Sequence, residues 1–214
     1  RVSLKLLNHL GIKKSLVSYY EHNKAFKGDK IVERILAGET CALVSDAGSP
    51  AISDPGEDLV NLCHQMGIPV GVVPGPTAVA SALALAGLPT GRFAFEGFLS
   101  VNKKERRIHL DSLKGERRTM VFYEAPHKLK HTLADLLAAL GDRPIALVRE
   151  ITKIHEEVIR TTLAAAVAKY EEEDPRGEFV VVVGGATATE AVAATPEEAA
   201  ELARAYLQEG LAPS

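Results

Sequence analysis

Ser45-Asp46-Ala47-Gly48-Ser49-Pro50-Ala51-Ile52-Ser53-Asp54-Pro55-Gly56 is a loop at the end of a short apolar stretch, Cys41–Ser45, which we predict to be a strand. Ligands of open α/β sheets bind at the carboxyl ends of the strands, which is where this loop would lie. Pro50 and Pro55 stiffen the loop, so that little conformational entropy is lost when it binds a ligand. The stretch therefore predicts an α/β fold with a ligand-binding loop at one sheet edge.

The loop also contains glycines and carboxylates. Gly48 and Gly56 permit backbone conformations that are closed to other residues, and they let a ligand approach the main chain. We expect Asp46–Ser49 to contact a ligand. For Asp54 and Gly56 we expect only a turn and a cap for the helix that follows.

A second loop, Val73-Pro74-Gly75-Pro76-Thr77-Ala78, also joins a predicted strand to a predicted helix. Free N–H groups at such a helix start can hold a carboxylate or a hydroxyl. The helix has many small side chains, which let either a ligand or another helix come close. Neither loop has the glycine pattern of a dinucleotide-binding or P-loop protein.

Strands and helices alternate through the first half, which predicts a parallel sheet in an N-terminal α/β domain, residues 1–88. Its predicted strands are Leu16–Tyr20, Cys41–Ser45 and Ile68–Val73, and its predicted helices are Arg1–Leu10, Asp29–Ala37, Glu57–Met66 and Thr77–Ala86.

Gly87–Gly91 has the composition of a linker, and a C-terminal α/β domain with a mixed sheet is expected over residues 92–214. Glu178–Val183 is apolar throughout, as is typical of a buried central strand. Thr195 is expected to cap a last helix. The other predicted strands are Phe93–Leu99, Arg118–Glu124, Ile145–Arg149 and Val158–Thr161, and the other predicted helices are Lys103–Leu113, His127–Leu140 and Leu163–Glu173.

Charge is unevenly spread along the 214 residues, whose net charge is −3. Residues 92–131 hold ten Lys or Arg against five Asp or Glu, whereas residues 171–214 hold two against ten. A basic middle segment indicates one face for an anionic partner. The two cysteines form no disulfide or metal pattern, and the sequence shows no signal peptide and no apolar run of the ~20 residues that a membrane helix needs, which indicates a cytoplasmic protein.

Several motifs occur in a fixed order along the chain: residues 46–56, Pro74–Thr77, Gly97-Phe98-Leu99, Phe122-Tyr123-Glu124-Ala125-Pro126-His127-Lys128, and Arg149-Glu150-Ile151-Thr152-Lys153. Together they resemble the ribosomal RNA small subunit methyltransferase I family, the cytidine 2′-O-methyltransferases of the tetrapyrrole methylase superfamily. The resemblance extends to about Gly185.

The resemblance implies a two-domain tetrapyrrole methylase-like fold, that of class III methyltransferases, with S-adenosylmethionine between the domains. It implies a homodimer without a metal, acting on a cytidine ribose in the decoding region of 16S rRNA, as free RNA or in the assembled 30S subunit. Members of that family begin with a strand and a glycine-containing loop ahead of the helix that opens this sequence. We expect the natural protein to carry these elements.

Site residues follow from the motifs and from the chemistry. The predicted cofactor-binding residues are Ser45, Asp46, Ala47, Gly48, Ser49, Pro74, Gly75, Pro76, Thr77 and Ala78. A weakly nucleophilic ribose hydroxyl needs a base or an orienting group, for which the candidates are Glu124, His127 and Lys153. The predicted RNA-binding residues are Lys103, Lys104, Arg106, Arg107, Lys128 and Arg149, with Tyr123, Phe98 or Phe95 as stacking partners of a base.

Two alternatives remain open at this stage. One is a methylase of the same fold that acts on a small tetrapyrrole, for which a basic face is unnecessary. The other is a binding module without catalytic activity.

Overall fold

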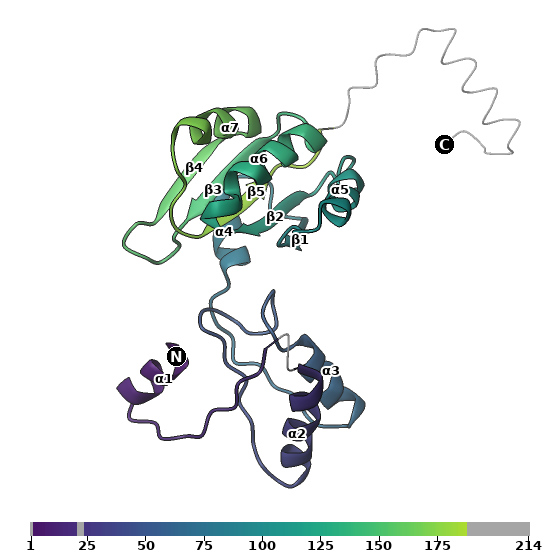
Figure 1. Ribbon diagram of the computed structural model, residues 1–214, viewed down its shortest axis with the longest axis vertical. Coiled ribbons are helices and arrows are strands. Elements are labelled where there is room, and N and C mark those ends of the chain that lie inside the picture. The colour runs from purple at the N-terminus through teal and green to yellow at the C-terminus, as the bar shows by residue number, and fades with distance from the viewer. Residues whose placement is uncertain (1, 21–23, 188–214) are drawn as a thin grey trace, which may run out of the picture.

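The computed structural model describes residues 2–20 and 24–187. Along the chain, the elements are α1 (Val2–His9), α2 (Lys24–Leu36), α3 (Glu57–Gln65), α4 (Ala78–Ala86), β1 (Phe93–Gly97), α5 (Lys103–Ser112), β2 (Thr119–Glu124), α6 (Pro126–Leu140), β3 (Pro144–Arg149), β4 (Glu157–Thr162), α7 (Leu163–Glu172) and β5 (Phe179–Val183). Figure 1 shows a layered sheet region in the second half and helices joined by long irregular segments in the first.

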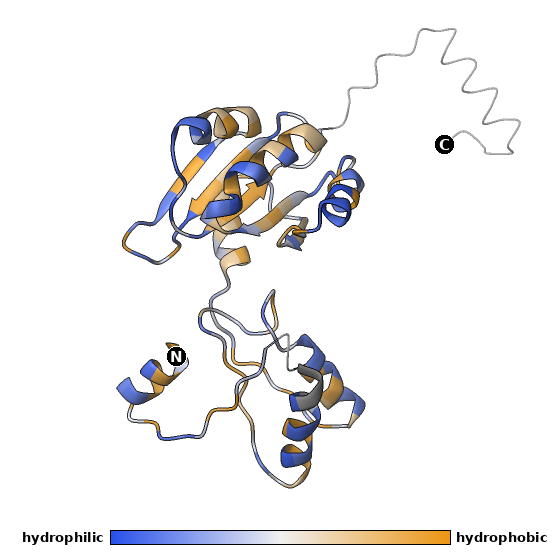
Figure 2. Ribbon diagram, viewed as in Figure 1, coloured by the Kyte–Doolittle hydropathy of each residue, from blue (hydrophilic) through white to orange (hydrophobic). Residues whose placement is uncertain are grey.

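A five-stranded mixed sheet, with strand order β1-β2-β5-β3-β4, forms the centre of the second half. β1 and β2 are parallel, and the other neighbouring strands are antiparallel. β5 lies in the middle and every one of its residues is buried, which confirms the prediction of a central apolar strand. Figure 2 shows β3 and β5 as apolar strands, whereas the outer helix α5 is largely polar.

Both faces of this sheet are covered by helices. On one face, side chains such as Phe122, Leu147 and Val181 pack with apolar residues of α5, α6 and α7. On the other face, Val121, Val148 and the adjacent side chains pack against α4. Since alternate residues of a strand point to opposite faces, the apolar strands supply both cores.

α4 lies in the range expected for the first domain, yet it packs onto the sheet of the second. Its small residues Ala82 and Ala86 are almost fully buried against that sheet. Arg160 of β4 donates hydrogen bonds to the carbonyls of Leu85 (2.7 Å) and Ala86 (3.2 Å). The small side chains of α4 therefore serve close packing against the sheet.

The three strands predicted in the first half are absent: Leu16–Tyr20, Cys41–Ser45 and Ile68–Val73 are irregular. A strand is stable when its backbone groups pair with a neighbouring strand and its apolar side chains are covered. Within the described residues these segments have no strand partner, and Val72 and Val73 are 83% and 91% exposed. The apolar contacts of this half come instead from a small cluster of α2, α3 and nearby residues.

One predicted helix start and one predicted cap were wrong, and a further predicted cap lies outside the described residues. The second helix was predicted to begin at Asp29, but α2 begins at Lys24, so Asp29 lies inside the helix. The cap of α3 is Gly56 itself, without a side-chain hydrogen bond, so Asp54 does not cap the helix. Gly56 has φ +146°, a backbone conformation that residues with a Cβ rarely adopt, and this favours glycine here. The helix expected at Thr195 lies outside the described residues.

Candidate functional site

The two loops predicted to bind a ligand lie against each other. The Ser49 amide donates a hydrogen bond to the Pro76 carbonyl at 3.1 Å. Gly48 has φ +73°, and a Cβ there would lie 3.2 Å from the same carbonyl. The Ser45 hydroxyl donates to the Ala47 and Gly48 carbonyls at 3.0 and 3.1 Å, which fixes the turn. The structure thus brings together two segments that are separated by about thirty residues in the sequence.

A cavity of about 460 Å³ opens beside these loops, within the usual size range of small-molecule sites. It is bounded by the start of α4, the carboxyl ends of β2 and β3, the loop after β3, and the amino end of β5. Its lining residues are Ala47, Gly48, Ser49, Ile52, Asp54, Pro76, Thr77, Ala78, Ser81, Phe98, Tyr123, Glu124, Ala125, Val148, Glu150, Ile151, Thr152, Lys153, Glu178, Phe179 and Val180.

Six of the ten predicted cofactor residues line this cavity: Ala47, Gly48, Ser49, Pro76, Thr77 and Ala78. Ser45 does not line the cavity, but its hydroxyl forms the hydrogen bonds that fix the turn. Asp46 accepts a long hydrogen bond from the Ser3 hydroxyl at 3.4 Å. Pro74 and Gly75 are likewise outside the lining.

Sequence reasoning missed several lining residues, chiefly Asp54, Ser81 and Glu178. Glu178 comes immediately before β5, which pairs antiparallel with β3 so that Phe179 lies opposite Arg149. That pairing places the amino end of β5 beside the carboxyl end of β3. No sequence signal gives the direction of the pairing. Asp54, in contrast, lies within the quoted loop and could have been found there.

Glu124 is a buried carboxylate, 4% exposed, at the end of β2. Its Oε1 accepts a hydrogen bond from the Ala125 amide at 2.8 Å, and its Oε2 accepts one from the Thr132 hydroxyl at 2.5 Å. Arg106 of α5 donates to the same Thr132 oxygen at 2.8 Å and to Asp135 at 2.6 Å. The network fixes the orientation of the carboxylate and leaves it further acceptor capacity toward the cavity.

Tyr123 connects β2 to the start of α4. Its hydroxyl accepts a hydrogen bond from the Val79 amide at 3.0 Å, and its ring packs edge-on against Phe95 and Phe98. Burial raises the pKa of Tyr123. The buried Thr77 hydroxyl lies close by without a well-aligned hydrogen bond to any described residue. Tyr123 thus links the end of β2 to the start of α4 at the cavity wall.

Lys153 is held between two carboxylates of the cavity wall. Its Nζ lies 2.8 Å from an oxygen of Glu150 and 2.8 Å from an oxygen of Glu178. Hydrogen bonds to Glu150 and then Glu178 raise the pKa of Lys153, so the amine is protonated at neutral pH. The geometry therefore argues against Lys153 as a proton acceptor and fits a role in holding the loop after β3 to the start of β5.

Backbone strain is concentrated around this cavity. The described non-glycine residues with positive φ are Ala51 (64°), Ser53 (55°), Glu150 (50°) and Thr152 (65°). The first pair flanks the lining residue Ile52, and the second pair lines the cavity directly. Such conformations cost energy and persist where the surrounding structure enforces them, often at ligand sites.

The remaining candidate groups lie elsewhere. His127 is exposed at the start of α6 and is outside the cavity lining. Lys103, Lys104 and Arg107 are exposed on α5, and Lys128 is half-buried on α6. Arg149 donates to the Arg176 carbonyl at 2.6 Å and lies 3.1 Å from Glu157, so it is engaged within the fold, as Arg106 is.

The described residues contain no group of three or more His, Cys, Asp or Glu placed to hold a metal ion. They also contain no helix with the length and apolar character needed to cross a membrane.

Several curated proteins that are similar to this chain carry the same name. The chain is 43% identical over 208 residues to a Synechocystis sp. protein named Ribosomal RNA small subunit methyltransferase I, covering 97% of this chain and 75% of that protein. A Thermotoga maritima protein of the same name is 45% identical, with 86% of this chain and 83% of that protein covered. One from Halalkalibacterium halodurans is 48% identical, and the chain spans 64% of its length.

The fold of the chain is similar to that of several solved structures. A structure of the methyltransferase CobJ aligns with TM-score 0.57 and 24% identity, covering 75% of this chain and 70% of that one. A diphthine synthase structure aligns with TM-score 0.61 and 13% identity, covering 85% and 73%. Residues 8–167 match the family described as Tetrapyrrole (Corrin/Porphyrin) Methylases. With relatives this similar over this much of its length, the chain belongs to the tetrapyrrole methylase family and, within it, to the ribosomal RNA small subunit methyltransferase I group.

Proposed function

We propose that this chain transfers a methyl group from S-adenosylmethionine to the 2′-hydroxyl of a cytidine ribose in the decoding region of 16S rRNA. The observation that carries the proposal is one cavity bounded by the two joined loops on one side and by Glu124 and Lys153 on the other. Family membership supports methyl transfer from S-adenosylmethionine, and the names of the relatives support ribosomal RNA as the class of substrate.

The cavity has features that suit a sulfonium nucleoside. The absence of a side chain at Gly48 lets the two loops that line the cavity lie close to each other. Carboxylates of Asp54, Glu124 and Glu150 line the cavity and would favour a positively charged cofactor. S-adenosylmethionine supplies an activated methyl group, so the protein's task is to bind, orient and exclude water.

The nucleophile needs orientation and a proton acceptor. Glu124 is the side chain we assign to this task, because its carboxylate is buried, held in place by Ala125 and Thr132, and borders the cavity. Lys153, paired with Glu150 and Glu178, would hold the loop after β3 in place beside the substrate. Tyr123 and Phe98 supply aromatic surface for a base.

The test uses labelled cofactor. The purified chain, S-adenosylmethionine with a tritiated methyl group, and 30S subunits that lack the modification are expected to yield labelled 2′-O-methylcytidine, identified after nuclease digestion. Free 16S rRNA in a parallel reaction distinguishes the two forms of the substrate. Label on uroporphyrinogen and none on RNA would instead support the tetrapyrrole alternative. Cofactor binding without transfer to either substrate would support a binding module.

A variant links the reaction to the cavity. Glu124→Gln is expected to lower kcat by roughly 100-fold or more, since a positioned acid–base group contributes about that much. The affinity for S-adenosylmethionine, measured by calorimetry, should stay within a few-fold. The resemblance also implies a homodimer, which analytical ultracentrifugation tests.

A further inference from the structure

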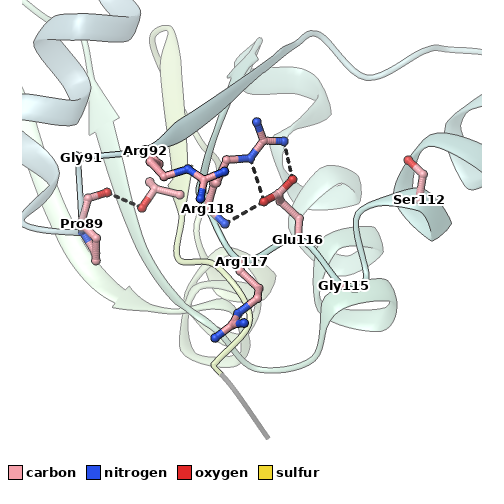
Figure 3. Close-up of a pocket in the computed structure, with 9 residues that line it drawn as sticks. Pro89, Gly91, Arg92, Ser112, Gly115, Glu116, Arg117 and Arg118 are labelled. Atoms are coloured by element: carbon pink, nitrogen blue, oxygen red, sulfur yellow. Dashed lines mark hydrogen bonds and ion pairs between the residues drawn. The ribbon is translucent and has the colours of Figure 1, made fainter. Parts of the chain in front are cut away.

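A second cavity, of about 900 Å³, lies at the opposite end of β2 from the candidate active site. β2 begins at Thr119, beside this cavity, and ends at Glu124, beside the other. Five steps along a strand span about 17 Å. Figure 3 shows the residues that line the cavity: Pro89, Gly91, Arg92, Ser112, Gly115, Glu116, Arg117, Arg118 and Thr119.

The floor of this cavity is rigid. Arg143, a buried residue, donates to the carbonyls of Lys114 at 2.6 Å, Glu116 at 3.2 Å and Leu140 at 3.1 Å. The Ala186 amide donates to the same Glu116 carbonyl at 2.7 Å. These hydrogen bonds therefore fix the backbone of the loop between α5 and β2, which carries several of the side chains that line the cavity.

Glu116, the single carboxylate in the lining, is used entirely by Arg118. Its Oε1 accepts from the Arg118 backbone amide at 2.7 Å and from Nε at 2.9 Å, and its Oε2 accepts from Nη2 at 2.6 Å (Figure 3). These bonds to Arg118 lower the pKa of Glu116 to about 2. Arg92 and Arg117 are exposed and form no ion pair with a described residue. Three guanidinium groups against one carboxylate leave the lining with an excess of positive charge.

The two hydroxyl groups of the lining are already engaged. The Thr119 hydroxyl donates to the Pro89 carbonyl at 2.5 Å, and the Ser112 hydroxyl donates to the His109 carbonyl at 2.6 Å. No aromatic residue belongs to the lining, so no aromatic ring is offered there to a base. The lining offers charge and the planar guanidinium fork, which matches phosphate oxygens. Contacts of this kind to phosphates position a nucleic acid.

We propose that this cavity binds phosphate groups of the RNA backbone, and so anchors a segment of the substrate at a distance from the reacting ribose. The inference rests on the proposed function, because it takes ribosomal RNA as the substrate. The lining holds three guanidinium groups against one carboxylate, which suits more than one phosphate and so favours a polyanion.

The test is a double variant, Arg92→Gln with Arg117→Gln, in an assay of binding to unmodified 30S subunits at several salt concentrations. RNA affinity at about 100 mM salt is expected to fall by roughly tenfold or more, and the slope of log affinity against log salt by about 1 to 2. KM for 30S subunits should rise while kcat and the affinity for S-adenosylmethionine stay unchanged. Lys169→Gln, on α7 and paired with Glu173, is the matched control and should change none of these quantities.

The outcomes separate this inference from the proposed function. If the double variant folds with an unchanged Tm and binds 30S subunits with the affinity and salt slope of the wild type, the phosphate site is refuted and the methyltransferase stands. If the variant loses binding of inorganic pyrophosphate but keeps that of 30S subunits, the site takes a small anion and the inference is wrong. If the wild type itself neither binds nor methylates 30S subunits, the proposed function fails and this inference fails with it.

Discussion

The Thr132 hydroxyl lies 2.5 Å from the Glu124 carboxylate and accepts a hydrogen bond from Arg106 at 2.8 Å, so a threonine inside α6 joins a surface helix to the floor of the candidate active site. Thr132 is 1% exposed and Glu124 is 4% exposed. The hydroxyl both donates and accepts here, as a Thr or Ser hydroxyl can. The orientation of Glu124 therefore depends on a residue that does not line the cavity.

Thr132→Val is expected to lower both stability and turnover. Valine has the same shape but removes the hydrogen bond to Glu124 Oε2 and the one from Arg106 Nη2, while the bonds of Glu124 to Ala125 and of Arg106 to Asp135 remain, at a cost of about 1–3 kcal/mol in the free energy of unfolding. Urea denaturation measures the loss, and kcat for RNA methylation should fall more than KM rises. Thr132→Ser restores the hydroxyl and should recover most of both. A valine variant with the kcat of the wild type would show that Glu124 needs no such support.

Gly48→Ala is expected to weaken cofactor binding. Alanine at φ +73° costs about 1–2 kcal/mol, and its Cβ would also crowd the Pro76 carbonyl, which lies 3.2 Å away. Gly67 is a matched control, because its φ is +66° and nothing lies within 4 Å of a Cβ there. Gly67→Ala should therefore introduce the backbone strain of a positive φ without a steric clash. Calorimetry with S-adenosylmethionine should show at least a tenfold loss for Gly48→Ala and little change for Gly67→Ala; equal losses would contradict the proposed contact between the loops.

Much of the second half could be predicted from sequence because its signals are local. The apolar run at Phe179–Val183 and the helix start at Asn102, where the side chain accepts hydrogen bonds from the Lys104 and Glu105 amides, give their elements without knowledge of the rest. The predicted strand Ile68–Val73 has the same apolar character, but a strand also needs a neighbour, and within the described residues it has none. Pairing is a property of two segments, which a local pattern cannot supply.

In the candidate site, too, some parts follow from local sequence and others depend on the pairing of distant segments. Loops rich in Gly and Pro were found from sequence, since their conformations depend on those residues. Glu178 was missed because only the antiparallel pairing of β3 and β5 brings it to Lys153. The sequence shows that residues 92–131 are basic. It does not distinguish Arg107, which is exposed, from Arg106, which forms an ion pair with Asp135.

Lys153→Met is expected to lower stability by at most about 1 kcal/mol near neutral pH, because the ion pairs are partly exposed. The pKa of Lys153 is raised from 10.5 in the folded state, so its contribution is complete below about 10.5 and is lost as the pH rises through the folded value. Urea unfolding of wild type and variant between pH 8 and pH 12 should therefore converge at the alkaline end. A difference that persists there would mean that Lys153 acts through packing rather than charge.

Charge reversal on α5 should separate RNA contact from folding. Arg107 is exposed, whereas Arg106 lies 2.6 Å from Asp135 and donates to Thr132. Arg107→Glu is therefore expected to weaken capture of 30S subunits several-fold and to lower the salt dependence, with Tm and cofactor affinity unchanged. Arg106→Glu is expected instead to lower Tm, since it places a carboxylate beside Asp135 and removes a partner of Thr132. Filter binding and thermal unfolding of the two variants check both expectations. An Arg107→Glu variant that binds 30S subunits as tightly as the wild type at low salt would remove this helix from the RNA-binding face.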